Sequence, residues 1–321
     1  MARAFITGAS GFVGPWLCQA LLAEGWDVVA GTHGPAADPH VAAPEFDRRA
    51  VQWVACDVRD GAELARTVER AAPDAIFHLA GVSFVPAASA DPGAALEVNV
   101  TGAARLVAAV APLKAAGTLD PVVLIVGSGL QYGSHPPDRM PLAEDTPQEP
   151  RDVYSASKAA QEQLAMAAWR GERVRVIATR SFNHSGPGQP SHFLLPRLVR
   201  EALALRDLGG DTLTIGNVDS VRDFLHVADV ARAYVALATR GTPGEAYNVA
   251  SGTGIRVDDA VARVLALAGV RARLNVTPAL QRAVDVPVLV GDSSKLRAAT
   301  GWAPQHTFDT IIHDFIRAAS R

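Results

Sequence analysis

Tyr154 and Lys158 have side chains whose types and spacing could carry out acid–base chemistry together. They stand near the start of an apolar-periodic segment, 153–169, that predicts a helix, and residues four apart share one helix face. A phenol with a pKa of about 10 is a poor acid–base group at neutral pH, but a nearby ammonium group lowers that pKa. The pair could then exchange a proton with a ketone or alcohol oxygen. Taken alone, the spacing also fits an unrelated tyrosine and lysine on the surface.

Ser128 follows a short apolar segment, 122–126, that predicts a buried strand. In a parallel α/β sheet the carboxyl ends of the strands form the edge where ligands bind. The Ser128 hydroxyl could donate a hydrogen bond to a substrate carbonyl there, and a turn serine is the alternative. Ser128, Tyr154 and Lys158 are therefore the predicted catalytic residues.

Three glycines spaced three apart lie between the first predicted strand, 4–7, and the first predicted helix, 13–24. Such a turn needs one glycine for its tight bend, one for the approach of a pyrophosphate and one for helix–strand packing. The helix N-terminus adds free N–H groups and the positive end of its dipole. The position of this turn predicts a dinucleotide site, although the glycines alone would also fit a plain turn. The predicted phosphate-binding residues are Gly8, Ser10, Gly11, Phe12, Val13 and Gly14.

The end of the second predicted strand, 28–31, bears on which dinucleotide is bound. NAD sites usually carry an acidic residue there for the adenosine ribose, and this chain has Thr32 and His33 instead. The missing acid favours NADP(H), and NAD(H) remains possible. Asp57 could bond the adenine or could cap the following turn. Further predicted cofactor contacts are Val58, Leu79, Ala80, Asn99, Tyr154 and Lys158.

Strands and helices alternate along the first 180 residues. Further strands are predicted at 51–55, 75–79 and 173–179, and further helices at 60–71, 94–116, 195–205 and 228–238. Near-continuous apolar strands separated by helices predict a parallel sheet covered on both faces. We therefore expect an α/β protein, a Rossmann-type doubly wound parallel sheet with a smaller, mostly C-terminal lobe. The sheet domain is predicted to comprise 1–180 plus about 217–248, and the lobe about 181–216 plus 249–321.

Composition narrows the class of protein. With a formal net charge of −3, the chain lacks the basic character of a nucleic-acid binder. Two cysteines far apart, Cys18 and Cys56, predict neither a disulfide framework nor a metal site, and they fit a reducing cytoplasm. The apolar start of the chain contains acidic residues and glycines, so we interpret it as the first strand and helix of the fold. No membrane span is expected, because no apolar stretch of about 18 residues is uninterrupted.

These residues together resemble the extended short-chain dehydrogenase/reductase family, the NAD-dependent epimerases and dehydratases, over essentially the whole chain. The segments 77–81 and 99–102 resemble its fourth-strand and N-x-x-G motifs, and 180–183 and 222–224 resemble the elements that lead to a nucleotide sugar. The resemblance implies that arginines bind the substrate diphosphate, with surface ion pairs as the alternative for each. The substrate contacts that it implies are Ser83, Ser128, Asn183, Phe193, Arg222 and Arg282.

Within this family the chain is most similar to the GDP-mannose dehydratases and the GDP-4-keto-6-deoxy-mannose reductases. The stretches 182–189 and 216–224, and the tail from 286 to 304, carry that similarity. Dehydratases of the family have an acid–Glu pair where this chain has Gly129 and Leu130, so dehydration is disfavoured. Leu130 also replaces the cysteine of the related 3,5-epimerases, and we interpret His192 as a loop residue.

With dehydration and 3,5-epimerisation disfavoured, the remaining reaction is hydride transfer without a second acid–base residue. This predicts reduction of the C4 ketone of a GDP-4-keto-6-deoxyhexose. The main rival is an NAD-retaining 4-epimerase that uses the same three residues. A protein that binds a dinucleotide without chemistry is a further alternative, disfavoured because the tyrosine is present. The alanine-rich helices at 94–116 and 153–169 match those that form a four-helix bundle in this family, so a homodimer is expected. A general bias toward alanine is the alternative explanation.

Overall fold

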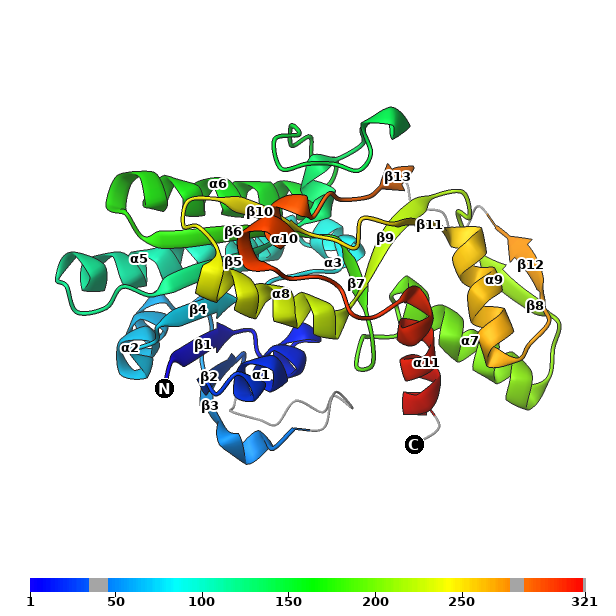
Figure 1. Ribbon diagram of the computed structural model, residues 1–321, viewed down its shortest axis with the longest axis horizontal. Helices are drawn as coiled ribbons and strands as arrows, with labels where there is room; N and C mark the ends of the chain where they lie inside the picture. Colours follow the sequence, from blue (N-terminus) through cyan, green and yellow to red (C-terminus); the bar gives the residue numbers. More distant parts are fainter. Residues whose placement is uncertain (35–45, 278–285, 320–321) are drawn as a thin grey trace.

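The computed structural model describes residues 1–34, 46–277 and 286–319 (Figure 1). Seven parallel strands form one sheet in the order β10-β6-β5-β4-β1-β2-β3. The strands are β1 (Arg3–Thr7), β2 (Asp27–Thr32), β3 (Val51–Ala55), β4 (Ala75–His78), β5 (Val122–Ser128), β6 (Arg175–Ser181) and β10 (Ala246–Val249). Their burial on both faces explains the near-continuous apolar runs, and the predicted α/β doubly wound class is confirmed.

Helices cover both faces of this sheet. On one face α1 (Val13–Ala23) packs beside α8 (Val227–Arg240), and their apolar side chains share a core with Tyr234 and Tyr247. On the other face lie α2 (Gly61–Ala71), α5 (Gly102–Ala115) and α6 (Val153–Glu172), as Figure 1 shows at the end of the molecule where the N-terminus lies. This layering places the carboxyl ends of β1, β4 and β5 at one sheet edge.

The predicted helix over 94–116 is interrupted in the structure. It consists of α4 (Pro92–Leu96), a π-helical turn over Glu97–Thr101, and α5. The turn directs Asn99 inward, where its amide bonds both backbone polar groups of Val82. The stretch Pro92–Ala115 is long and apolar enough to span a membrane by length and composition; in this fold it packs on α2 and α6.

Other predicted boundaries shift for local reasons. The helix predicted to end at 169 continues to Glu172, and Arg173 then adopts a left-handed conformation with φ 60° that ends it. The following strand consequently begins at Arg175 instead of 173. Ser128, which was expected to follow the fifth strand, is the last residue of β5 and pairs with Ser181.

The remaining elements form a smaller layer beyond the sheet. Strands β7 (Asn183–Ser185), β11 (Gly254–Arg256) and β13 (Val288–Leu289) pair with β9 (Val221–His226), and β8 (Thr212–Ile215) pairs with β12 (Arg273–Val276). Helices α7 (Leu194–Leu208), α9 (Val257–Ala268) and α11 (Phe308–Ala319) enclose a separate apolar core. We retain the sequence-based division into two lobes as a proposal. The short helix α10 (Ser294–Thr300) and Trp302 pack on the first core, beside α8.

Candidate active site

Helix α6 presents Tyr154 and Lys158 to the carboxyl edge of the sheet. Its N-terminus is fixed by a capping box, in which Asp152 accepts the Ser155 N–H and the Ser155 hydroxyl accepts the Asp152 N–H. Both Tyr154 and Lys158 lie on the buried face, as their spacing predicts. The capping box therefore fixes where the tyrosine meets the end of β5.

The Ser128 side chain acts on the Tyr154 phenol. Burial raises the pKa of Tyr154, and the Ser128 side chain lowers it in part. The expected lowering of the Tyr154 pKa by Lys158 is not found. The Lys158 ammonium instead donates to the Val126 carbonyl oxygen at 2.9 Å and to Gln161 Oε1 at 2.9 Å. Burial in turn lowers the pKa of Lys158 to about 8.

Gly81, which follows β4, lies beside Asn99 of the π-helical turn and the Lys158 amino group. A Cβ atom on Gly81 would lie 2.9 Å from Asn99 Oδ1 and 3.2 Å from Lys158 Nζ, so a side chain there would displace one of these groups. Asn99 also donates to Ser157 on α6 at 2.8 Å. The structure therefore brings Asn99, Lys158 and Tyr154 together, although they come from separate segments.

The three glycines of the first turn play different parts. Gly8 has φ +70°, and a Cβ atom on it would lie 2.6 Å from the Ala80 backbone. A Cβ atom on Gly14 would lie 2.0 Å from the Ala9 carbonyl oxygen. A Cβ atom on Gly11 would meet a single atom, the Gly8 oxygen at 3.3 Å. The fold thus requires Gly8 and Gly14, and the space above Gly11 suits a ligand that approaches the backbone.

An arginine that the sequence analysis missed stands at the ends of β2 and β3. Arg59 donates to both carboxylate oxygens of Asp57 and lies 2.7 Å from His33 Nε2. The Arg59 guanidinium lowers the pKa of Asp57. Asp57 also accepts the Arg59 N–H at 2.9 Å, so it caps this turn, as one of the two interpretations of Asp57 expected.

The loop after β6 reaches back to the glycine turn. The His184 ring stacks on Phe12 with ring centroids 6.0 Å apart, and the Trp16 indole donates to the Pro187 carbonyl oxygen at 3.2 Å. Further along, His192 packs against Phe84 with centroids 4.2 Å apart. His192 is thus a ring-packing residue of this loop, in agreement with its interpretation as a loop residue.

The described residues among the proposed substrate contacts lie on several elements. Ser83 precedes Phe84, whose ring lies 5.7 Å from that of Phe193. Asn183 is exposed on β7. Arg222 donates to the Val221 carbonyl oxygen at 2.8 Å. Arg282 lies outside the described residues.

Neighbouring Asp223, which was not predicted, is fully buried and accepts hydrogen bonds from Ser251, Gly252 and Gly291. It ties loops of the second lobe to β9. Among the described residues, no three metal-ligating side chains lie together.

The whole fold has many relatives. Residues 5–315 match the family model described as GDP-mannose 4,6 dehydratase. The chain belongs to this family. It is 34% identical to GDP-6-deoxy-D-mannose reductase of Pseudomonas aeruginosa, over 95% of this chain and 93% of the relative. It is 28% identical to dTDP-glucose 4,6-dehydratase 1 of Escherichia coli, over 97% of this chain and 90% of that enzyme.

Solved structures of the family superpose over their full length. The structure of RMD from Pseudomonas aeruginosa complexed with NADPH has a TM-score of 0.82, with 31% identity, and the match covers 99% of this chain and 98% of that one. A dTDP-glucose 4,6-dehydratase of Streptomyces venezuelae with NAD bound has a TM-score of 0.83, with 27% identity, and covers 99% and 97%. The extended short-chain dehydrogenase/reductase resemblance is therefore confirmed.

The two positions after Ser128 have apolar surroundings. A Cβ atom on Gly129 would already lie 3.1 Å from the Phe182 ring. Leu130 packs against the apolar cluster that contains Tyr154. Neither Gly129 nor Leu130 has a side chain that can act as a base.

Proposed function

We propose that this protein uses NAD(P)H to reduce the C4 ketone of a GDP-4-keto-6-deoxyhexose, a reaction suggested by its 34% identical Pseudomonas relative, which is named GDP-6-deoxy-D-mannose reductase. The observation that carries this proposal is that Ser128 ends β5, Lys158 bonds Val126 of the same strand and the Ser128 side chain acts on the Tyr154 phenol, while Gly129 and Leu130 occupy the adjoining positions. One proton donor and no second base match a reduction better than a dehydration.

The residues at the sheet edge have the chemistry that such a reduction needs. The bound nicotinamide supplies hydride to C4, and Tyr154 donates the proton that converts the resulting alkoxide into an alcohol. The raised pKa of Tyr154 keeps its phenol protonated at neutral pH, as a general acid requires. Ser128 donates a hydrogen bond to the C4 oxygen, and Lys158 holds the cofactor ribose. Donors placed where negative charge develops stabilise the transition state.

The glycine turn and the ends of β2 and β3 form the proposed dinucleotide site. The open backbone at Gly11 suits the pyrophosphate, and Arg59 places a cationic donor beside His33 beyond β2, where many NAD sites have an acid. An arginine suits a ribose phosphate, so NADP(H) is favoured and NAD(H) remains possible. We assign the substrate contacts to Ser83, Asn183, Phe193, Arg222 and Arg282.

The experiment is to follow oxidation of NADPH and NADH with GDP-4-keto-6-deoxy-mannose, generated in place by a dehydratase. Tyr154→Phe keeps the ring and removes the acid, so we expect kcat to fall roughly 100- to 10,000-fold. Tyr247→Phe is the matched control, because it also removes one buried hydroxyl. Tyr247 lies on β10, away from the site, and its hydroxyl accepts the Thr242 N–H. Its activity should equal that of the unaltered protein.

A 4-epimerase is the second candidate, because it would use the same three residues. It would retain NAD and return the hydride after the ketone rotates. No oxidation of either coenzyme, together with NAD released on denaturation, would overturn the reductase proposal in favour of the epimerase.

A homodimer built from α5 and α6 and a cytoplasmic location complete the proposal. The two helices pack on each other, and alanines at Ala156, Ala160 and Ala167 are exposed along α6. Cys18 and Cys56 are unpaired and buried, which suits a reducing compartment. GDP-sugars are the expected ligands, and neither nucleic acid nor a membrane is an expected partner.

A further inference from the structure

A buried polar network joins α6 to the ends of β5 and β6. Its centre is the ion pair of Glu162 with Arg180, whose side chains are 4% and 7% exposed. The guanidinium donates through Nε to Oε2 at 3.0 Å and through Nη2 to Oε1 at 2.6 Å. Bidentate geometry of this kind fixes both side chains in one orientation. Glu162 lies one helical turn beyond Lys158, on the same buried face of α6.

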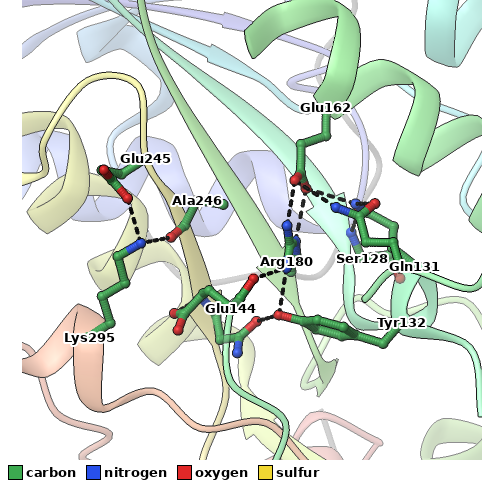
Figure 2. A network of polar contacts seen from close by, with 11 residues as sticks. Ser128, Gln131, Tyr132, Glu144, Glu162, Arg180, Glu245, Ala246 and Lys295 are labelled. Carbon is green, nitrogen blue, oxygen red and sulfur yellow. Dashed lines mark hydrogen bonds and ion pairs between the residues drawn. The ribbon is translucent and has the colours of Figure 1, made fainter. Parts of the chain in front are cut away.

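Gln131 connects this ion pair to the catalytic edge, and Figure 2 shows it between Ser128 and Glu162. Its Nε2 donates to Glu162 Oε2 at 2.8 Å, and its Oε1 accepts the Ser128 N–H at 2.7 Å. The side chain is fully buried. The amide therefore has one fixed orientation, because only its nitrogen can donate to the carboxylate and only its oxygen can accept the N–H.

Gly127 provides the space that this arrangement needs. A Cβ atom at position 127 would lie 2.3 Å from Gln131 Oε1 and 2.5 Å from the Thr179 carbonyl oxygen. The strand thus carries a glycine where the Gln131 amide turns inward toward the backbone of Ser128. Gln148 supports the same carboxylate, since its Nε2 donates to Glu162 Oε1 at 2.8 Å.

The consequence concerns the Ser128 hydroxyl. Gln131 fixes the backbone nitrogen of Ser128, while the Ser128 hydroxyl accepts the Leu130 N–H at 3.2 Å and lowers the pKa of the Tyr154 phenol in part. Tyr154 and Glu162 lie on one helix, so the network also fixes the distance between α6 and the end of β5. Gln131 itself does not reach the reacting atoms.

We propose that Gln131 is a positioning residue that fixes Ser128 against Tyr154 by bridging the Ser128 backbone to the Glu162–Arg180 ion pair. The inference rests on the proposed reductase function, because it assigns Gln131 an effect on the transfer of the proton and the hydride. Small displacements of a catalytic donor lower rates strongly, so the network should act on kcat more than on binding.

The test compares Gln131→Met, Ser128→Ala and the double variant in the NADPH oxidation assay. Methionine keeps the length of the side chain and removes both hydrogen bonds. We expect kcat to fall roughly 10- to 100-fold, with the KM values of NADPH and of the GDP-sugar within about twofold of those of the unaltered protein. We further expect that Gln131→Met has little added effect when Ser128 is already alanine, since Gln131 acts through Ser128.

Tyr247→Phe again serves as the control for loss of a buried hydrogen bond, and kcat is expressed per NADPH-binding site so that unfolded protein does not count. Unchanged kcat in Gln131→Met, or effects of the two substitutions that simply multiply, would overturn the proposal. If Gln131→Met does not fold, Glu162→Gln carries the test, because it keeps the side-chain shape and weakens the hold on Gln131. A severalfold lower kcat at constant KM supports the proposal there, and unchanged kcat overturns it.

The proposed function and this inference fail in different ways. An unaltered protein that oxidises neither coenzyme contradicts the function itself. An active unaltered protein whose Gln131 variants keep full kcat contradicts the positioning role alone.

Discussion

The fold buries the amino group of Lys158 almost completely, with 4% of the residue exposed, and gives it two neutral acceptors in place of a carboxylate. Burial disfavours the charged form of lysine and lowers its pKa to about 8 from 10.5. An isolated buried charge of this kind destabilises the folded state. The position is therefore one at which catalytic need and stability oppose each other.

We expect Lys158→Met to abolish reduction and to stabilise the fold below pH 8. Below both pKa values, in the folded and the unfolded chain, the cost of burying the ammonium is fully present. The difference between the two Lys158 pKa values, about 8 and 10.5, corresponds to a gain in the free energy of unfolding of at most about 3 kcal/mol for Lys158→Met. The loss of the two hydrogen bonds subtracts from this gain. As pH rises through this interval the folded protein loses the proton first, so the advantage of methionine declines.

Urea unfolding of both proteins at pH 7 and above pH 10.5 measures this difference. An advantage of Lys158→Met that stays constant or grows with pH would contradict the assignment of a lowered Lys158 pKa.

Candidate site residues could be chosen from the sequence where sequence order and chain position defined them. The tyrosine, the lysine and the serine were chosen from their places after the glycine turn and the fifth strand. Contacts between distant segments were not predictable, and so the Val126 acceptor of Lys158 was missed. Gln131 carried a readable signal, since Ser128 and Gln131 have the spacing of a capping box, which the structure contains. Arg59 had no comparable signal, because its role depends on how β2 and β3 align.

The turn between β1 and α1 behaves as an element in which three glycines do separate jobs. We expect Gly11→Ala to keep a Tm close to that of the unaltered protein, since its Cβ would meet a single atom at 3.3 Å. The added methyl group stands where the backbone approaches the pyrophosphate, so the NADPH Kd should rise about tenfold or more. Gly14→Ala places its Cβ 2.0 Å from the Ala9 carbonyl oxygen and should instead destabilise the fold.

Thermal unfolding and fluorescence titration with NADPH separate the two effects. Equal losses of stability and of NADPH binding in both variants would show that Gly11 has no special relation to the ligand.

Element boundaries were harder to predict than the elements themselves. The apolar periodicity of 94–116 continues across the π-helical turn, so nothing local marks the interruption. The cause is the pairing of Asn99 with Val82, which lies 17 residues earlier in the chain. The small sheet around β9 escaped prediction for a related reason. Its partner strands have two or three residues each, too few for a periodic pattern, and β13 joins from the far end of the chain.

At the scale of the whole molecule, alternation of strands and helices was enough to predict the sheet and its two layers. It did not predict how the residues beyond β6 are held against this sheet. The Trp16 indole donates to the Pro187 carbonyl oxygen, and the buried His226 ring lies edge-on to Trp16 at 5.4 Å and stacks on His306 at 4.4 Å. These rings come from distant segments of the chain, and patterns in a single sequence do not encode contacts of this kind.

The outer surface of the α5–α6 layer carries the last prediction, which concerns assembly. Ala156, Ala160, Gln163 and Ala167 are exposed and recur every three or four residues, so they form one stripe along α6. Leu96 on the neighbouring α4 is 45% exposed, and Ala108 on α5 is exposed as well. Small side chains permit close approach of a second copy, and an isologous contact across a two-fold axis would cover this surface.

We expect the unaltered protein to sediment as a dimer at micromolar concentration and Ala160→Arg to sediment as a monomer with an unchanged helical content. Arginine at the centre of the stripe would place two charges close to the two-fold axis without disturbing the sheet behind α6. Ala299→Arg, at an exposed position of α10, is the matched control and should remain dimeric.

An unaltered protein that sediments as a monomer refutes the dimer, whereas an Ala160→Arg dimer as tight as the unaltered one places the interface on another face. Because Tyr154 and Lys158 lie on the opposite, buried side of the same helix, a monomeric variant that keeps its kcat would show that α6 positions the site without help from a partner.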